Sequence, residues 1–190
     1  MDDTQHAHRG EGLRADAIRN RDALLAAARH GLACGDDTLA MNALAKEAGV
    51  GVGTAYRHFP NRQVLLEALA VDSFDKLVLI AREIADDPDT VHALEQLIGS
   101  AIEFQLDDPG LAAVLASETP ACSDTKELFG ELGQLISQVL TRGVQEGVIS
   151  ATLDATDIKH LVCGTAFAVR AAGRDSLDNY VQVLVKGLRA

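Results

Sequence analysis

The fold is decided by residues 44–60, which run Leu44-Ala45-Lys46-Glu47-Ala48-Gly49-Val50-Gly51-Val52-Gly53-Thr54-Ala55-Tyr56-Arg57-His58-Phe59-Pro60. The pattern predicts a short helix that ends at Gly49, a glycine turn, a second short helix and a stop at Pro60. Such a pair of helices is a helix-turn-helix, whose second helix enters the major groove in many DNA-binding proteins. Because the second helix here carries polar and basic side chains, the segment favours DNA recognition.

An ordinary helical corner is the alternative interpretation of this segment, since many all-helical proteins contain one. Val50 is apolar and can fill the gap between the two short helices. Tyr56, Arg57 and His58 cluster hydrogen-bonding groups on a helix that is too short to form a core. Thr54 lies near the N-terminus of that helix, the end that points into the major groove in this motif. These features favour the DNA-binding interpretation.

The charge of the chain is unevenly distributed. Its formal net charge is −11, which by itself argues against binding to DNA. Residues 1–62 contain eight Lys or Arg and eight Asp or Glu, however, whereas residues 63–190 contain nine and twenty. This division fits a DNA-binding head on an acidic body that phosphates would repel.

Composition indicates a protein that can bury a core and remain in solution, with 190 residues of which 47% are hydrophobic and 24% charged. No apolar run reaches the roughly 18 residues of a membrane span. The polar N-terminus lacks the basic and apolar regions of a secretory signal. We therefore expect a cytoplasmic protein that makes no contact with a membrane.

No group of residues indicates catalysis, a metal site or a cofactor. Cys34, Cys122 and Cys163 are far apart and form no CxxC pair, so neither zinc nor a disulfide framework is expected. The lone histidines His92 and His160 could bind a ligand or metal, but surface and structural roles are more common.

Helical periodicity dominates the rest of the chain, without an alternating strand pattern, so the expected fold class is all-α. In the first expected helix, one face carries Ile18, Leu25, Ala28 and Leu32. Asn61 is expected to cap the helix that starts at Arg62. The first four expected helices cover about residues 14–33, 40–48, 52–58 and 62–85. Five more are expected: one after Pro88, one that begins at Pro109, one that contains Leu128, one that begins after Asp154 or Thr156, and one that begins at Ser176.

Residues 13–69 resemble the DNA-binding domain of the tetracycline-repressor (TetR) family of bacterial regulators. The resemblance is carried by Ile18, Ala27, Ala28, Gly35, Leu44, Ala45, Ala48, Gly49, Val50, Gly53, Thr54, Tyr56, His58, Phe59, Arg62, Leu65 and Leu66. It implies an all-helical homodimer with a three-helix helix-turn-helix head and a six-helix body for ligand binding and dimerisation. We therefore expect a disordered arm over 1–12, a helix-turn-helix DNA-binding domain over 13–61, and a ligand-binding and dimerisation domain over 62–190.

The resemblance also implies roles for residues of the head. Thr54 and Arg57 become candidates for contact with base edges, and Tyr56, His58 and Arg62 candidates for contact with phosphates. Many family members have Ser or Thr where the second helix opens, but this chain has Ala40. Thr38 could serve as the cap instead if that helix began earlier.

In the body, the resemblance implies a cavity between the long connecting helix and the central helices. Its expected walls are Phe74, Val78, Ile98, Ile102, Phe104, Phe129, Ile136 and Phe167. Few aromatic rings are available, which favours an apolar or modestly polar ligand, and Glu103 or Glu118 could select a cationic group. The last two helices are expected to form a four-helix dimer interface through Val162, Thr165, Ala166, Val169, Tyr180, Val181, Leu184 and Leu188.

The interpretation that follows is a bacterial transcriptional regulator, a repressor that binds a palindromic operator as a homodimer and is released by an unknown small molecule. It needs no cofactor. Two alternatives stay open. One is a ligand-independent activator or architectural protein with the same head, and the other is a helical enzyme or interaction module in which residues 38–60 form a structural corner.

Overall fold

The computed structural model describes residues 3–36, 38–150 and 153–190. These residues form nine α-helices and one short 3₁₀ helix, so the predicted all-α fold, with three helices before a six-helix body, is confirmed. The chain divides into two compact units between Leu69 and Ala70, inside helix α4 (Arg62–Ala85) rather than at its start. Within the described residues, no helix combines the length and apolar character needed to cross a membrane.

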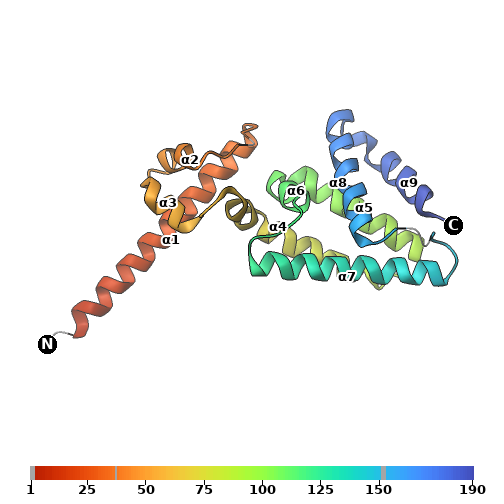
Figure 1. The fold of residues 1–190 in the computed structure, drawn as a ribbon, viewed down its shortest axis with the longest axis horizontal. Coiled ribbons are helices and arrows are strands. Elements are labelled where there is room, and N and C mark those ends of the chain that lie inside the picture. Colours follow the sequence, from red (N-terminus) through yellow and green to blue (C-terminus); the bar gives the residue numbers. More distant parts are fainter. Residues whose placement is uncertain (1–2, 37, 151–152) are drawn as a thin grey trace. The chain divides into compact units, whose positions relative to one another are not determined.

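The head consists of α1 (Asp3–Ala33), α2 (Met41–Glu47), α3 (Val52–His58) and the first turns of α4. The C-terminal half of α1 packs against both α2 and α3, whereas its N-terminal half continues beyond them (Figure 1). The core of this unit is formed by Leu24, Leu25, Ala27, Ala28, Leu39, Leu44, Ala45, Ala55, Phe59, Leu65 and Leu66.

The first helix differs from the sequence-based expectation in two ways. It begins at Asp3, where a disordered arm over 1–12 was expected, and residues 1 and 2 lie outside the described part. Ile18 is 61% exposed although it shares a helical face with the buried Leu25 and Ala28. The reason is that α2 and α3 cover only the later turns of α1, so the same face is buried at one end and in solvent at the other.

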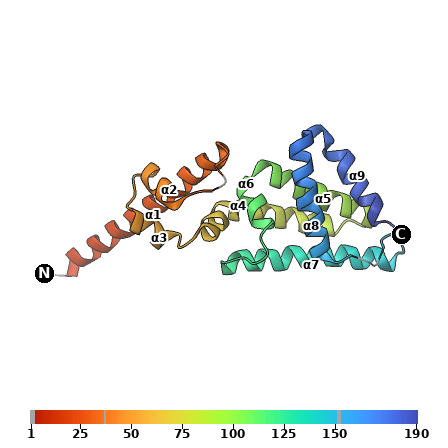
Figure 2. The ribbon, with the colours of Figure 1, turned by 45° about the horizontal axis from the view of Figure 1, so that its top comes forward.

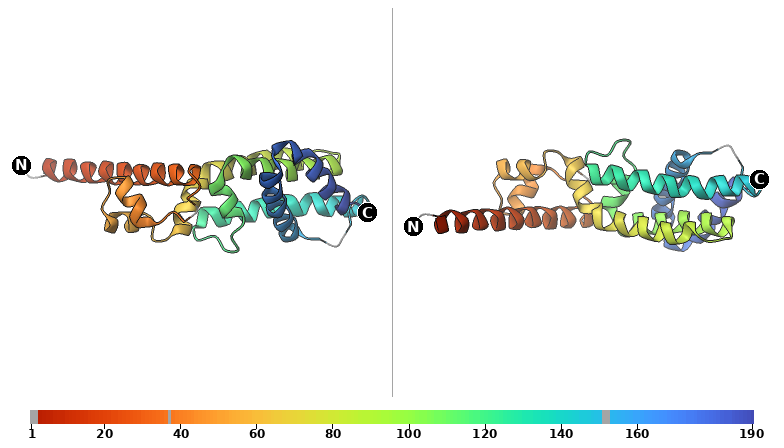
Figure 3. Two further views of the ribbon diagram at one scale, coloured as in Figure 1. Left: turned by 90° about the horizontal axis from the view of Figure 1, so that it is seen from above. Right: turned by 90° about the horizontal axis from the view of Figure 1, so that it is seen from below.

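The body consists of the remainder of α4, followed by α5 (Thr90–Asp107), α6 (Pro109–Leu115), α7 (Ser123–Gln145), α8 (Ala155–Ala172), the 3₁₀ helix Arg174–Ser176, and α9 (Leu177–Leu188). Helix α5 is central and contacts α6, α7, α8 and α9. Helix α8 crosses α7 at a steep angle (Figures 1 and 2). Helices α4 and α7 lie side by side, joined by an edge-on contact of Phe74 with Phe129 and by the Arg82–Glu131 ion pair (Figure 3).

Aspartates fix where three body helices begin. The carboxylates of Asp89, Asp108 and Asp154 each accept hydrogen bonds from two backbone N–H groups in the first turn of α5, α6 and α8. Asp154 also forms a reciprocal capping box with Asp157, which decides between the two N-caps that the sequence allowed for α8. The N-terminal N–H groups of a helix have no partner within the helix, so these aspartates satisfy donors that would otherwise be unpaired.

Arg142 of α7 holds the connection between α4 and α5 in place. Its guanidinium donates to Thr90 Oγ1 at 2.7 Å, to the Ala85 carbonyl at 3.1 Å and to the Asp87 carbonyl at 2.7 Å. In the same connection Asp87 Oδ2 lies 2.6 Å from His92 Nδ1. The carboxylate raises the pKa of His92, and the histidine lowers the pKa of Asp87, chiefly through this hydrogen bond.

Gly143 of α7 lies so close to Ile149, in the connection between α7 and α8, that there is no room for a side chain. A Cβ at this buried position would lie 3.0 Å from Thr90 Cγ2 and closer still to the Ile149 side chain. Gly143→Ala should therefore destabilise the body by about 1–3 kcal/mol, despite the better helix propensity of alanine. Urea denaturation followed by circular dichroism measures the change.

Gly130 in the same helix provides the matched control, because it is exposed and nothing lies within 4 Å of the Cβ position. Gly130→Ala should stabilise the protein by about 0.5–1 kcal/mol. Equal stability of the Gly143→Ala variant and the wild type would show that the contact with Ile149 does not limit packing.

Candidate functional site

A glycine turn between α2 and α3 positions the second helix of the motif. Gly49 has a φ of +66°, the left-handed region that glycine adopts without steric cost. Its N–H donates to the Lys46 carbonyl at 3.2 Å, and the Val50 N–H donates to the Ala45 carbonyl at 2.8 Å. These two bonds form a Schellman motif, which satisfies the last carbonyls of α2 and fixes the direction in which the chain enters α3.

Helix α3 has one buried side and one exposed side. Ala55 within the helix and Phe59 just after it are 0% and 1% exposed. On the opposite side, Tyr56 is 47% exposed and Arg57 is also exposed. Val52 and Gly53 are exposed on the same side, which we call the α3 face: Val52, Gly53, Tyr56 and Arg57.

Of the five residues predicted to contact DNA, the structure places four on α3 and the fifth at the start of α4. Thr54 and His58 are half-buried at the border of the α3 face, and Arg62 is exposed. Asn61 caps α4 as predicted, accepting a hydrogen bond from the Val64 N–H at 2.9 Å. Polar and basic side chains therefore lie at the end of α3 and at the start of α4, on either side of the buried Phe59 in the sequence.

Asp36 is a carboxylate whose electrostatic field reaches Arg62. Thr38 donates to Asp36 through its hydroxyl and its backbone N–H, and these hydrogen bonds lower the pKa of Asp36, with a smaller contribution from the charge of Arg62. Thr38 therefore pairs with Asp36 and does not cap α2. The N-cap of α2 is Ala40, which provides no side-chain hydrogen bond.

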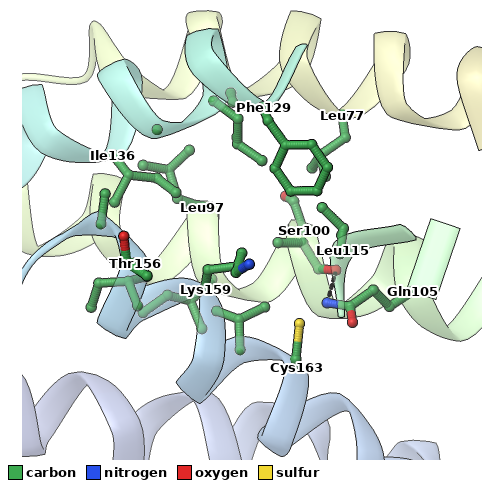
Figure 4. A pocket seen from close by; sticks show the side chains of 18 of the residues that line it. Leu77, Leu97, Ser100, Gln105, Leu115, Phe129, Ile136, Thr156, Lys159 and Cys163 are labelled. Carbon is green, nitrogen blue, oxygen red and sulfur yellow. Dashed lines mark hydrogen bonds between the residues drawn. The ribbon is translucent and has the colours of Figure 1, made fainter. Parts of the chain in front are cut away.

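The body encloses a cavity of about 260 Å³ bounded by α4, α5, α7 and α8 (Figure 4). Its walls are mostly aliphatic, with one aromatic ring, that of Phe129. The apolar lining includes Leu77, Ala81, Leu94, Leu97, Ile98, Leu115, Phe129, Leu132, Ile136, Ile158 and Val162, and the polar lining includes Ser100, Gln105, Glu118, Thr156, Lys159 and Cys163.

Only some of the residues that were predicted to line this cavity do so in the structure. Ile98, Phe129 and Ile136 line it. Phe74 is buried behind Phe129, with the two ring centroids 5.0 Å apart and nearly perpendicular. Phe74 is therefore absent from the lining, as are four other predicted residues: Val78 and Ile102 are buried, Phe104 is half-buried and Phe167 is 70% exposed.

The sequence analysis did not predict Lys159, the basic residue of the cavity lining, nor most of the aliphatic lining residues. The predicted acidic candidates differ in place, since Glu103 is exposed outside the lining and Glu118 lines the cavity with an exposed side chain. The signal for Lys159 was its spacing of three and four residues before Val162 and Cys163, which puts all three on one side of α8. A lysine on the side of an amphipathic helix that faces the protein interior is unusual, so this position could have been identified as a candidate binding residue.

The residues predicted for the dimer interface divide between the two sides of α8 and α9. Val162, Ala166, Val169, Val181 and Leu188 are buried within the single chain, so their interface assignment does not fit the structure. Thr165, Tyr180 and Leu184 are half-buried. The large apolar side chains that these helices expose are Leu161 at 38%, Phe167 at 70% and Val183 at 63%.

The remaining candidates are the histidines and cysteines that were considered as ligand-binding or metal-binding residues. His92 pairs with Asp87, and His160 is exposed. Cys34 is exposed, whereas Cys122 and Cys163 are half-buried. Among the residues that the structure describes, no group of three or more His, Cys, Asp and Glu side chains could hold a metal ion.

A helix-turn-helix with an exposed polar face, joined to a helical body that encloses a cavity, defines the class of helix-turn-helix regulators. The model for "Bacterial regulatory proteins, tetR family" matches residues 24–69. An HTH-type transcriptional regulator of Staphylococcus aureus (strain USA300) is 30% identical over 78 residues, or 40% of this chain and 42% of that relative. The chain thus spans about two fifths of the length of the curated relatives that it matches.

Solved structures resemble the chain over most of its length. A TetR transcriptional regulator of Streptomyces coelicolor is 27% identical, with 89% of this chain and 98% of that chain covered and a TM-score of 0.52. RolR, crystallised with its ligand resorcinol, has the same fold at 18% identity, with 92% and 89% covered and a TM-score of 0.60. The chain belongs to the tetR family of bacterial regulatory proteins. The prediction of a helix-turn-helix transcription regulator, not an enzyme, is confirmed at the level of the family.

Proposed function

We propose that the protein is a repressor that binds a palindromic operator as a homodimer and is released when a small molecule occupies the body cavity. The observation that carries the proposal is the α3 face, where Tyr56 and Arg57 are exposed while Ala55 and Phe59 hold the helix against the head core. A buried side and a polar exposed side are what a recognition helix needs, because one side must be fixed for the other to contact bases.

The head residues would divide between base contact and phosphate contact. Arg57 carries a guanidinium that can pair with the two acceptors of guanine in the major groove, and Thr54 can contact a base edge. Tyr56, His58 and Arg62 would donate to phosphates and fix the position of the head on the duplex. Residues 1–62 contain equal numbers of acidic and basic residues, so the rest of the chain accounts for the net charge.

The exposed side of α8 and α9 supports association with a second copy. Phe167 and Val183 are large apolar side chains that remain mostly in solvent in the single chain. Gly164 and Gly187 lie exposed three and four residues away from them, where the absence of side chains allows close helix packing. We name this the α8–α9 face: Leu161, Gly164, Phe167, Val183 and Gly187. A two-fold contact of this face would form a four-helix interface.

The cavity supports release by a ligand. A ligand shifts the protein away from the DNA-binding state only if it binds the other state more tightly. The structure of RolR with resorcinol is an instance of this fold holding a small organic compound. A ligand-independent regulator with the same head is the alternative, and duplex binding that no small molecule changes would favour it.

The DNA-binding role can be tested on an operator recovered by selection of genomic fragments with the purified protein. Arg57→Ala should weaken operator binding by about 1–3 kcal/mol and relax sequence preference at one position. Arg62→Ala should weaken binding to all duplexes to a similar degree and reduce the salt slope by about one. Fluorescence anisotropy over a salt series measures both effects.

Arg174→Ala is the control for these variants, because Arg174 is exposed on the body and pairs with Asp107. It should leave operator affinity unchanged. Wild-type affinity in a Tyr56→Ala/Arg57→Ala/Arg62→Ala variant would exclude the α3 face as the DNA-binding surface.

The dimer can be tested with Phe167→Glu combined with Val183→Glu. Each charge occurs twice in a two-fold interface, so the dimer dissociation constant should rise by about a hundredfold or more. Operator affinity should fall with it, and sedimentation velocity measures the assembly. Leu79→Glu is a matched control, because Leu79 is 54% exposed on α4, outside the α8–α9 face. A dimer that survives the double substitution would place the interface elsewhere.

A further inference from the structure

We propose that the body cavity binds small apolar carboxylic acids, with the ammonium group of Lys159 as the partner of the ligand carboxylate. The inference rests on the proposed function, because it names the chemical class of the ligand that the cavity holds. It also reverses the sequence-based expectation of a cationic ligand selected by Glu103 or Glu118.

Lys159 reaches from α8 into the space enclosed by α5 and α7 (Figure 4). Its Nζ donates to the Ser117 carbonyl at 3.2 Å and lies 5.7 Å from the centroid of the Phe129 ring. The side chain is therefore half-buried between a carbonyl and an aromatic ring, both of which interact favourably with an ammonium group. An ammonium has three donors, and the Ser117 carbonyl accepts one of them.

The charge of Lys159 is not balanced by an ion pair among the described residues. The ion pairs of the body within this part of the chain are Arg82–Glu131, His92–Asp87 and Arg174–Asp107. Burial raises the pKa of Cys163, so this neighbouring thiol stays neutral and adds no negative charge. A carboxylate from a ligand would supply the missing partner, with a charge-assisted hydrogen bond in a partly water-excluded site.

The remaining walls define the rest of the ligand. Leu77, Leu97, Leu115 and Ile136 surround the space with aliphatic groups, which favour a hydrocarbon body over a polar one. The volume of about 260 Å³ falls below the roughly 300–1,000 Å³ typical of sites for drug-sized ligands. The occupant is therefore a small acid with an alkyl or short aryl-alkyl body.

The first turn of α8 contributes Ala155 to both the cavity and a hollow on the surface. This hollow shares Phe129, Gly133 and Ala155 with the cavity. Ala155 is four residues before Lys159, so this shared wall lies about one helical turn from Lys159 along α8. Glu118 also lines the cavity but is exposed, and it is the group that would favour an amine instead.

Isothermal titration calorimetry on the full chain tests the inference with octanoate, 1-octanol and octylamine, three probes that share one alkyl body. Octanoate should bind most tightly to the wild type. Lys159→Met keeps the length of the side chain and removes the charge, so octanoate should bind about 10- to 100-fold more weakly while 1-octanol changes little. Lys76→Met, at an exposed position of α4, is the matched control and should bind all three probes like the wild type.

Four results would overturn the inference. The first is equal affinity of the wild type for octanoate and 1-octanol. The second is unchanged octanoate affinity in Lys159→Met, whose fold is checked by circular dichroism and melting temperature. The third is preference for octylamine with loss of its binding in Glu118→Gln, which would assign recognition to the carboxylate. Absence of binding by octanoate and by 4-phenylbutanoate at millimolar concentration would also reject the acid-binding site.

Operator binding with and without each probe separates this inference from the proposed function. Octanoate that binds through Lys159 but leaves operator affinity unchanged would retain the acid site and reject ligand-controlled release. Release by octanoate and 1-octanol to the same degree would retain ligand control and reject the role of Lys159.

Discussion

A seven-residue helix is not stable alone in water, and α3 exists because the head core holds its inner side. Ala55 and Phe59 are almost completely removed from solvent, and the guanidinium of Arg21 lies 5.5 Å from the centroid of the Phe59 ring. The turn at Gly49 sets the direction of α3 relative to α2, so the two constraints together determine which side chains face outward. Tyr56 and Arg57 are exposed as a consequence of what Ala55 and Phe59 bury.

In the body, too, the packing of neighbouring helices determines which side chains are buried. Helix α5 is surrounded by four others, and side chains such as Leu94, Ile98 and Ile102 are nearly inaccessible. The packing is not complete, because α4, α5, α7 and α8 leave a cavity that contains a lysine. A half-buried ammonium with only a carbonyl and an aromatic ring as described partners costs desolvation free energy. In a well-packed core an aliphatic residue would avoid that cost, so the position of Lys159 is the basis of the proposal that the cavity binds an acid.

Much of the local structure could be predicted because it depends on neighbours in the chain. The ends of α2, α4 and α8 follow from Gly49, Asn61 and Asp154, each of which forms the expected turn or cap. The α3 segment was also predicted within its observed bounds, since a glycine turn before it and a proline after it leave little freedom. The failed cap at Thr38 shows the limit of such rules: its hydroxyl donates to Asp36, and α2 begins only after Ala40.

The sequence by itself determined the all-α class, the order of the helices, the bounds of α3 and α4, and the position of the helix-turn-helix, but not the start of α1. Only the tertiary structure decided which apolar residues of a helix face inward, and against what. Along α8, Val162 and Ala166 are buried while Phe167 is exposed, and along α1, Ile18 is exposed while Leu25 is buried. Helical periodicity identifies residues that share a face, but burial depends on helices brought close from distant parts of the chain. For the same reason the cavity and its lysine emerge only when α4, α5, α7 and α8 come together.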